Sequence, residues 1–384
     1  MGLSTGSGAP LITVTYLSMD PLTSTVGSSQ VLAYIERLAL AGVDIDLVTF
    51  EHAVDVALSE RLSSLGVGWR PQRYGRHGSV GGLGRVLRAA WAVRKVGLAH
   101  ARSDMAAAAV MLGGVERWVW DVRSFWADQK VATGVMKAGS LQERVMQWVE
   151  RRAAYRSDAV ITLTASAIVE LDRRYDCVVS PKAQVITTCV DVDRFWLSDL
   201  PSGSLRVLLA GTLNRYYDVE LMLDLVAELR RREPVEFIVA SPTDTDWERE
   251  FLRAKAVRLS TTPSDMAALV SSCHIGLSIC RDDAGLSLLA AMPTKIGEFL
   301  ASGRPVVVNA GLVDATEMLE SNGCGVAVGM SSCTNVVEVA DRLEELRVDL
   351  STTARCRSLA ERSFNLDHGV GSLVEVYSAL TVSR

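Results

Sequence analysis

One segment of the second half, AMPTKIGEFLASGRPVVV at 291–308, combines side chains that could bind a phosphorylated ligand. Pro293 suits the first turn of a helix, and Gly303 suits its end. Lys295 and Glu298 then lie about one turn apart on the same helical face. The Glu298 carboxylate could accept two hydrogen bonds from a vicinal diol, and Lys295 is near enough to the helix N-terminus to meet a phosphate. An ordinary surface pair, worth little energy, is the alternative interpretation.

A second candidate is the loop MDPLTSTVGSSQ, which follows the first apolar segment of the chain. Gly27, Ser28 and Ser29 precede a predicted helix, so free backbone N–H groups and the positive end of the helix dipole would form an anion site. A Ser cap with a Gly turn would explain the same residues. The chain contains neither GxGxxG nor GxxxxGK[ST], so it has neither a dinucleotide fingerprint nor a P-loop.

Alternating strands and helices must position these residues. Residues 11–18 are apolar and β-branched, 29–41 have helical periodicity, and 44–50 are again strand-like, which predicts a βαβ unit and a parallel sheet. The alternation lapses after Asp193 and restarts near 205. We therefore predict an α/β fold with two Rossmann-like, doubly wound domains, at 1–195 and 204–362, facing across a cleft.

Composition limits the class of protein. The 384 residues are 48% hydrophobic and 22% charged, which excludes disordered, fibrous and disulfide-scaffold classes. Seven scattered cysteines without a CxxC pair favour reduced thiols, and no signal peptide or membrane span is expected. We therefore expect a cytoplasmic protein.

The net charge of −5 conceals an uneven distribution. Residues 1–196 carry +3 and the remainder carries −8, and nine basic residues from Arg61 to Arg102 occur without a single acidic one.

Within 81–96, one predicted face holds Val86, Leu87, Ala90, Trp91 and Val93, with Arg85, Arg88, Arg94 and Lys95 beside or opposite it. Such a helix could contact the inner face of an anionic membrane or attract a lipid phosphate. It could equally pack Trp91 into the core. Nucleic acid is disfavoured, because the pI is about 5.7 and no nucleic-acid-binding motif is present.

The segment 291–308 resembles the nucleotide-sugar signature of retaining GT-B glycosyltransferases of family 4, the glycosyl transferases group 1. In that family a Glu five residues before the Gly of a G-x-P-V turn binds the ribose hydroxyls, and Glu298, Gly303, Pro305 and Val306 match this arrangement. Other stretches resemble the same family in the expected order: DPLTSTVGSSQVLAYIERLALAG, LVTFE, HARSD, WDVRSFWADQK, VITTCVDVDRF and LLAGTLNRYYD.

The resemblance implies transfer of a hexose-type sugar from a nucleotide diphosphate sugar, with a UDP-sugar favoured, to a hydroxyl acceptor. Retention at the anomeric carbon, no bound metal and no other cofactor are implied too. The first domain would bind the acceptor, the second would bind the donor, and the last helix, at 366–384, would pack back on the first domain.

The resemblance also implies roles for particular residues. The phosphate-binding candidates are Lys295, Arg281 and Arg215, in that order. Further donor-binding candidates are Gly211, Thr294 and Ser287. The candidates on the sugar and acceptor side, where catalysis would occur, are Asp121, Arg123 and Asp128, and structural pairing of these charged side chains is the alternative.

The chain departs from the family pattern in three places. Ala290 occupies the position eight before Glu298, where relatives often carry a second Glu, and Thr212 follows Gly211 where they carry a basic residue. The His that relatives place after the fourth strand is absent. A nucleotide-sugar 2-epimerase of the same fold and a non-catalytic sugar-nucleotide-binding partner therefore stay open. The Asp-x-Asp motifs at 191–193 and 244–246 would suit a metal-dependent glycosyltransferase with one nucleotide-binding domain. The two successive sheets predicted for this chain disfavour that interpretation.

Overall fold

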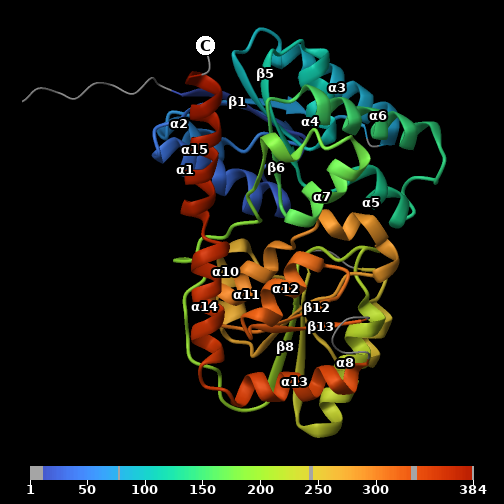
Figure 1. Cartoon of the computed structure of the whole chain (residues 1–384). Helices are drawn as coiled ribbons and strands as arrows, with labels where there is room; N and C mark the ends of the chain where they lie inside the picture. The colour runs from blue at the N-terminus through green and yellow to red at the C-terminus, as the bar shows by residue number, and fades with distance from the viewer. Residues whose placement is uncertain (1–11, 77, 242–244, 330–334, 383–384) are drawn as a thin grey trace, which may run out of the picture. The chain divides into compact units, whose positions relative to one another are not determined.

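The computed structural model describes residues 12–76, 78–241, 245–329 and 335–382 (Figure 1). Asp244 of the second Asp-x-Asp motif lies outside them. The chain divides into two compact units. Unit 1 comprises Met1–Asp121, Val149–Ile161 and Val370–Arg384, and unit 2 comprises Val122–Trp148 and Thr162–Gly369. Residues 122–148 and 162–195, which the sequence placed with the first domain, thus group with unit 2.

The first sheet has seven strands in the order β3-β2-β1-β4-β5-β6-β7. They are β1 (Thr13–Ser18), β2 (Asp44–Glu51), β3 (Gly68–Arg73), β4 (Leu98–Arg102), β5 (Arg117–Val122), β6 (Ala159–Thr162) and β7 (Ala183–Val185). β1 pairs in parallel with β2 on one side and with β4 on the other. The strand order therefore reverses between β1 and β4, and such a reversal defines the topological switch point of a doubly wound sheet.

Helices connect these strands. They are η1 (Gly27–Leu32), α1 (Ala33–Leu40), α2 (Val56–Ser64), α3 (Gly78–Val93), α4 (Asp104–Leu112), α5 (Trp126–Ala132), α6 (Leu141–Arg156) and α7 (Ala165–Arg174). Side chains fix the starts of two of them. Asp55 accepts a hydrogen bond from the N–H of Leu58 at α2, and Thr164 accepts one from Ala167 at α7.

The second sheet repeats this design with the order β10-β9-β8-β11-β12-β13. Its strands are β8 (Leu205–Ala210), β9 (Val235–Ala240), β10 (Val257–Leu259), β11 (Ile275–Ser278), β12 (Val306–Asn309) and β13 (Gly325–Val328). Alternate residues of β8 enter different cores, with Leu208 on one face and Val207 and Leu209 on the other. Burial of both faces explains the uninterrupted apolar runs of these strands. The predicted fold class, α/β with two doubly wound parallel sheets, is confirmed.

The remaining elements cover the second sheet or follow it. They are α8 (Val219–Arg232), α9 (Glu248–Arg253), α10 (Pro263–Ser271), η3 (Asp282–Ala290), α11 (Thr294–Ala301), α12 (Val313–Ser321), α13 (Val336–Val348), α14 (Thr352–Ser363) and α15 (Leu366–Val382). The final part of α15, from Val370 onward, belongs to unit 1.

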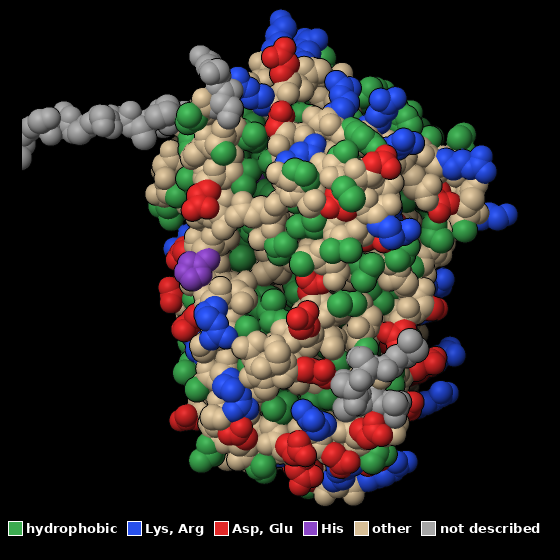
Figure 2. All heavy atoms as spheres, viewed as in Figure 1, with side chains coloured by type: hydrophobic (Ala, Val, Ile, Leu, Met, Phe, Trp, Pro, Cys, Tyr) green, Lys and Arg blue, Asp and Glu red, His purple; other side chains and the backbone are tan. Residues whose placement is uncertain are grey.

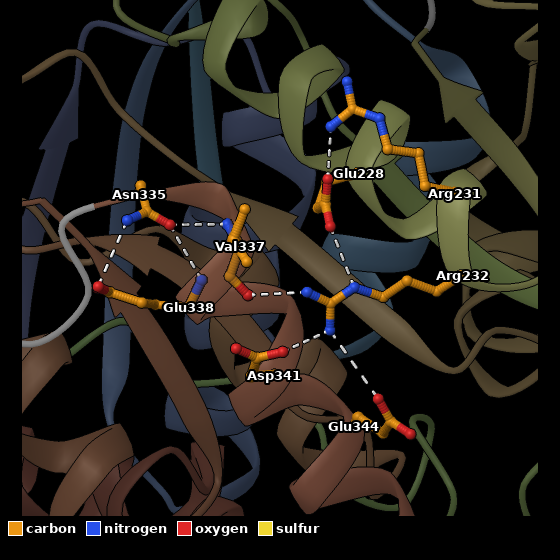
Figure 3. A network of polar contacts seen from close by, with 8 residues as sticks. All are labelled: Glu228, Arg231, Arg232, Asn335, Val337, Glu338, Asp341 and Glu344. Carbon is orange, nitrogen blue, oxygen red and sulfur yellow. Dashed lines mark hydrogen bonds and ion pairs between the residues drawn. The ribbon is translucent and has the colours of Figure 1, made fainter.

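A surface network joins α8 to α13 (Figure 3). Arg232 donates hydrogen bonds to Glu228, to Asp341 at 2.6 Å and to the carbonyl oxygen of Val337. Asn335 caps α13 by accepting from two backbone N–H groups of its first turn. Figure 2 shows acidic and basic side chains mixed over this region. The network therefore stabilises a solvated helix pair, and its acidic side chains outnumber its basic ones.

A buried polar chain holds α15 to the first sheet. The hydroxyl of Tyr377 lies 2.8 Å from Nδ1 of His100, and Nε2 of His100 lies 3.2 Å from Oδ2 of Asp121. Burial raises the pKa of Tyr377, so the hydroxyl stays protonated and can donate to Nδ1. The His100 ring then presents its Nε2–H to Asp121, and its face stacks on Tyr16 with the ring centroids 4.2 Å apart.

We expect Tyr377→Phe to lower the free energy of unfolding by about 1–2 kcal/mol, because it leaves the buried Nδ1 of His100 without this partner. Urea unfolding followed by tryptophan fluorescence measures the change. Ser378→Ala is the matched control, since the Ser378 hydroxyl bonds only the Val374 carbonyl of its own helix. An equal effect of the two substitutions would contradict the proposed importance of the buried chain.

Candidate functional site

The first turn of α11 carries a buried ammonium group. Lys295 follows Pro293, which precedes the helix, and its side chain is buried. Its Nζ lies 4.1 Å from the centroid of the Tyr217 ring and has no hydrogen-bond partner among the described residues. Burial lowers the pKa of Lys295 to about 8, although Cys280 and Glu298 oppose the shift. A buried donor without an acceptor is costly, so this position favours the binding of an anion.

Two glycines seat α11 against its neighbours. A Cβ added to Gly276 of β11 would lie 2.3 Å from the Phe299 ring, and one added to Gly297 would lie 3.0 Å from Phe364. The first of these approaches excludes any larger residue at Gly276, because Phe299 is fully buried. Tight packing on the sheet thereby fixes where the first turn of α11 points.

The end of β8 approaches Lys295. Gly211 has φ +107°, a conformation that L side chains rarely adopt, and a Cβ built there would lie 3.7 Å from Cε and Nζ of Lys295. The N–H of Gly211 donates to the Ala240 carbonyl oxygen at 2.9 Å. Gly211 directly follows the last residue of β8, so Gly211 and Lys295 lie at the carboxyl end of this strand. The strand order of the sheet reverses between β8 and β11, and open α/β sheets bind ligands at the carboxyl end of such a switch point.

Glu298 lies one turn after Lys295 and is partly exposed. Its carboxylate accepts no hydrogen bond from the described residues. Burial raises the pKa of Glu298 to about 7, and the charges of Arg194 and Lys295 oppose the shift. The site thus combines an available carboxylate with an available ammonium, as the sequence predicted.

The loop after β8 is fastened to the segment around η3. The N–H of Arg281 donates to the Tyr216 carbonyl oxygen at 2.9 Å, and the Tyr216 hydroxyl lies 3.2 Å from Oγ of Ser287. Ser287 is fully buried and also donates to the carbonyl of Ala284 at 2.8 Å. Ser287 therefore positions η3 and does not present its hydroxyl to a ligand, which corrects its assignment as a donor-binding residue.

The two candidate arginines have acidic partners. Arg281 donates from Nε to Asp283 at 2.8 Å, and Arg215 lies 3.7 Å from Asp246 with both side chains exposed. Thr294, the first residue of α11, is half-buried beside Lys295. Among these three candidates, Lys295 is the one whose charged group has no hydrogen-bond acceptor in the described residues.

The carboxylates predicted for catalysis have structural partners. Asp121 is buried and faces His100. Asp128 accepts from Arg174 at 3.0 Å, and that guanidinium also stacks on Phe125. Arg123 is half-buried and engaged as well. Asp121 belongs to unit 1, whereas Arg123 and Asp128 belong to unit 2. We therefore withdraw Asp121 and Asp128 as free catalytic groups, because each already compensates a neighbouring donor or charge.

The predicted anion site at Gly27, Ser28 and Ser29 is wrong. The helix begins two residues earlier, at Thr25, so these residues lie inside its first turns. The N–H of Gly27 donates to the Ser24 hydroxyl at 3.0 Å, and that of Ser28 donates to the Ser24 carbonyl at 2.8 Å. Gly27 is required for another reason, since its Cβ would lie 1.9 Å from the Pro21 carbonyl oxygen.

Arg102, which the sequence did not single out, occupies the corresponding place in the first sheet. It ends β4, is buried, and donates to Asp20 at 2.6 Å and to Gln30 at 2.8 Å. The carboxylate of Asp20 thus neutralises the cation at this switch point. His100 was also missed, because its partners Asp121 and Tyr377 are distant in the sequence.

A shallow surface hollow of about 650 Å³ lies elsewhere on unit 2. Ser204, Pro234 and Val257 are among its lining residues, so it opens at the amino ends of β8, β9 and β10. Lys295 and Gly211 lie at the opposite, carboxyl end of β8, about 20 Å away along a six-residue strand. The hollow is separate from the candidate site.

The two-sheet architecture is that of GT-B glycosyltransferases, with two Rossmann-like domains in one chain. Among solved structures, a sucrose-phosphate synthase from Thermosynechococcus elongatus is 14% identical with a TM-score of 0.69, covering 97% of this chain and 100% of that one. HepE from Anabaena in complex with UDP-glucose is 14% identical with a TM-score of 0.68, covering 96% and 99%. A glycosyltransferase from Rickettsia africae is 14% identical with a TM-score of 0.63, covering 98% and 100%. No protein-family profile and no curated protein sequence matches the chain. At this identity, the similarity establishes the fold.

Replacing Lys295 tests whether its charge is uncompensated. We expect Lys295→Met to stabilise the ligand-free protein by up to about 3 kcal/mol at pH 7, because the folded pKa is about 8 against 10.5 in the unfolded chain. Between pH 8 and 10.5 the lysine is protonated in the unfolded chain and largely neutral in the folded protein. The free energy of unfolding of the wild type therefore rises with pH over this range, and the stability advantage of the variant decreases. Urea unfolding across this range measures the difference.

Lys137→Met is the matched control, because Lys137 is exposed in unit 2. It should change the free energy of unfolding by no more than about 0.5 kcal/mol at any of these pH values. A Lys295→Met variant that is less stable than the wild type at pH 7 would show that the ammonium is compensated in the folded protein.

Proposed function

We propose that this protein is a retaining, metal-independent glycosyltransferase that moves a hexose-type sugar from a UDP-sugar to a hydroxyl acceptor. The observation that carries the proposal is the buried Lys295 ammonium, which lies beside Gly211 at the switch point of the second sheet and has no hydrogen-bond acceptor in the described part of the chain. A diphosphate would supply the missing acceptors. The GT-B fold and the UDP-glucose complex of the similar HepE support this class of ligand.

The residues of the site have separate roles in this proposal. Lys295 binds the diphosphate and stabilises the negative charge that develops as the sugar bond breaks. Glu298 accepts hydrogen bonds from the ribose diol, and Gly211 lets the backbone approach the phosphates closely. Arg281 is a second phosphate ligand, available once it exchanges Asp283 for the donor. Thr294 contributes its hydroxyl or backbone beside the phosphate.

Retention of configuration requires that the acceptor attack the anomeric carbon from the same face from which the leaving group departs. In the proposed reaction the bond from the anomeric carbon to the diphosphate oxygen breaks, and the acceptor oxygen forms the new bond. The acceptor proton passes to a phosphate oxygen of the leaving diphosphate. Chain residues therefore supply position and charge stabilisation, and no side-chain nucleophile is needed. The engagement of Asp121 and Asp128 with other side chains suits this division of roles.

The acceptor is proposed as a class only, a hydroxyl of a glycan, a lipid-linked intermediate or a small secondary metabolite. The proposed place of action is the cytoplasm, at the inner face of a membrane. Within the described ranges, no helix is long and apolar enough to cross a bilayer.

A panel of nucleotide sugars distinguishes the proposed transfer from its alternatives. Thermal shifts with UDP, GDP, dTDP and CDP first identify the base, since a ligand at 100 times its dissociation constant adds about 2.7 kcal/mol of stability. Incubation with the matching sugars follows. Diphosphate release supports transfer, an altered sugar supports a 2-epimerase, and binding without turnover supports a non-catalytic partner.

Glu298→Ala should weaken binding of UDP by roughly tenfold to a hundredfold, because hydrogen bonds to a charged group each contribute about 1.5–3 kcal/mol. Asp121→Ala should affect the dissociation constant less, since Asp121 lies in unit 1 beside His100. Glu317→Ala, an exposed carboxylate of the same unit, is the control. Isothermal titration calorimetry measures all three. Unchanged UDP affinity in Glu298→Ala would exclude its role as the ribose ligand.

Affinity for UDP-glucose should pass through a maximum between pH 7 and 8. Ionisation of Glu298, with a pKa of about 7, favours binding as the pH rises, and deprotonation of Lys295, with a pKa of about 8, opposes it at higher pH. The diphosphate diester keeps its charge across this range. Lys295→Arg should remove the decline above pH 8, and Glu298→Gln should remove the rise near pH 7. Calorimetry at each pH tests both, and a flat wild-type profile would refute the assignment.

A further inference from the structure

Helix α3 exposes a continuous apolar ridge formed by Val80, Leu83, Leu87 and Trp91. These side chains are 83%, 60%, 55% and 67% exposed, respectively. At 3.6 residues per turn they fall within an arc of about 80° and extend for about 17 Å along the helix. The opposite arc, which includes Val86, Ala89 and Val93, is buried. The ridge is thus a second apolar face of α3 beside the one that packs on the protein.

This arrangement differs from the face expected from the sequence. Val86, Ala90 and Val93 are buried, whereas Leu87 and Trp91 are exposed, so Trp91 is not a core residue. Arg85, expected beside or opposite the apolar face, is buried. Its guanidinium lies 4.3 Å from the Tyr74 ring centroid and donates to the Arg76 carbonyl at 3.0 Å. Arg85 therefore holds the start of α3 and is unavailable for a surface contact.

Cations lie beside the ridge and at its C-terminal end. Arg94 lies over the Trp91 ring at 4.7 Å, and Lys95 follows it as an exposed residue. Arg88 donates to the Arg73 carbonyl at 2.6 Å, which brings the end of β3 beside the helix. Arg73 and Arg76 are both exposed. From Arg61 to Arg102 the chain has no acidic residue, and acidic residues of other segments pair with Arg61, Arg70 and Arg102.

We propose that the α3 ridge docks on the surface of an anionic lipid bilayer. Val80, Leu83, Leu87 and Trp91 enter the boundary between head groups and acyl chains, and Arg73, Arg76, Arg94 and Lys95 contact lipid phosphates. Charge complementarity selects this occupant, because the cations flank an apolar ridge and lack acidic sequence neighbours. The paired indole and guanidinium of Trp91 and Arg94 suit the head-group level, where aromatic rings and cations concentrate.

The ridge is narrow and convex, which suits insertion into a deformable lipid surface. A binding mode of this kind needs both apolar insertion and electrostatic attraction, and each is removable by substitution without disturbing the buried arc of α3. The proposal goes beyond the proposed sugar transfer and does not depend on it. The proposal thus identifies the residues of α3 that would make the membrane contact suggested by the sequence.

Cosedimentation of the full chain with vesicles tests the proposal. The probes are vesicles of phosphatidylcholine alone and vesicles of equal parts phosphatidylcholine and phosphatidylglycerol. Wild-type protein should bind the anionic vesicles at least about tenfold more strongly, and added salt should weaken binding. Absence of binding to anionic vesicles, or equal binding to both kinds, would overturn the proposal. If the protein does not bind anionic vesicles, the alternative is that the α3 ridge binds an acidic protein surface.

Two double variants separate the contributions. Leu83→Ser with Leu87→Ser removes apolar ridge contacts, and Arg94→Gln with Lys95→Gln removes charge. Each should reduce the partition coefficient on anionic vesicles by roughly tenfold. Leu252→Ser with Leu350→Ser is the control, because both leucines are exposed in unit 2. Equal losses in the control would refute the ridge as the docking surface. Unchanged circular dichroism and urea midpoints confirm that the variants are folded.

Discussion

The second unit contains an electrostatic constraint, because the Lys295 ammonium is buried with no hydrogen-bond acceptor among the described residues. A cation in this position raises the free energy of the empty protein, so neighbouring elements must hold it there by packing. Gly276 admits the Phe299 ring beneath α11, and the loop after β8 is fastened to η3 through Tyr216. Rigid apolar contacts thus maintain an unfavourable charge where an anion would relieve it, which is how preorganised binding sites are built.

The two sheets use the same strand order for different purposes. Each has a switch point between its first strand and the strand added on the other side, β1 with β4 and β8 with β11. In the first sheet the cation at this position, Arg102, pairs with the Asp20 carboxylate and also donates to Gln30. In the second sheet the Lys295 ammonium faces the Tyr217 ring and has no hydrogen-bond partner among the residues that the structure describes. The net positive charge of residues 1–196 therefore does not indicate an anion-binding site at the switch point of the first sheet.

Local pattern was sufficient to predict the strands, the helix around Lys295 and Glu298, and the doubly wound class, because each depends on periodicity or on contacts one turn apart. It failed where a residue's partner is remote or where a boundary shifts. Asp121 meets His100 and Tyr377 only after folding, and Ser287 is buried by Tyr216. The helix at Gly27 begins earlier than its glycine suggested, and helical periodicity alone did not reveal which of two apolar faces of α3 packs inward.

The contact between Tyr377 and His100 has a consequence for the order of assembly during synthesis. The two residues are 277 positions apart, and all of unit 2 is encoded between them. At about 5–20 residues per second, a ribosome needs roughly 15–55 s to make that interval. Throughout it, the His100 ring in the first sheet lacks its hydroxyl partner and its α15 cover. The first unit to leave the ribosome is consequently the last to be completed.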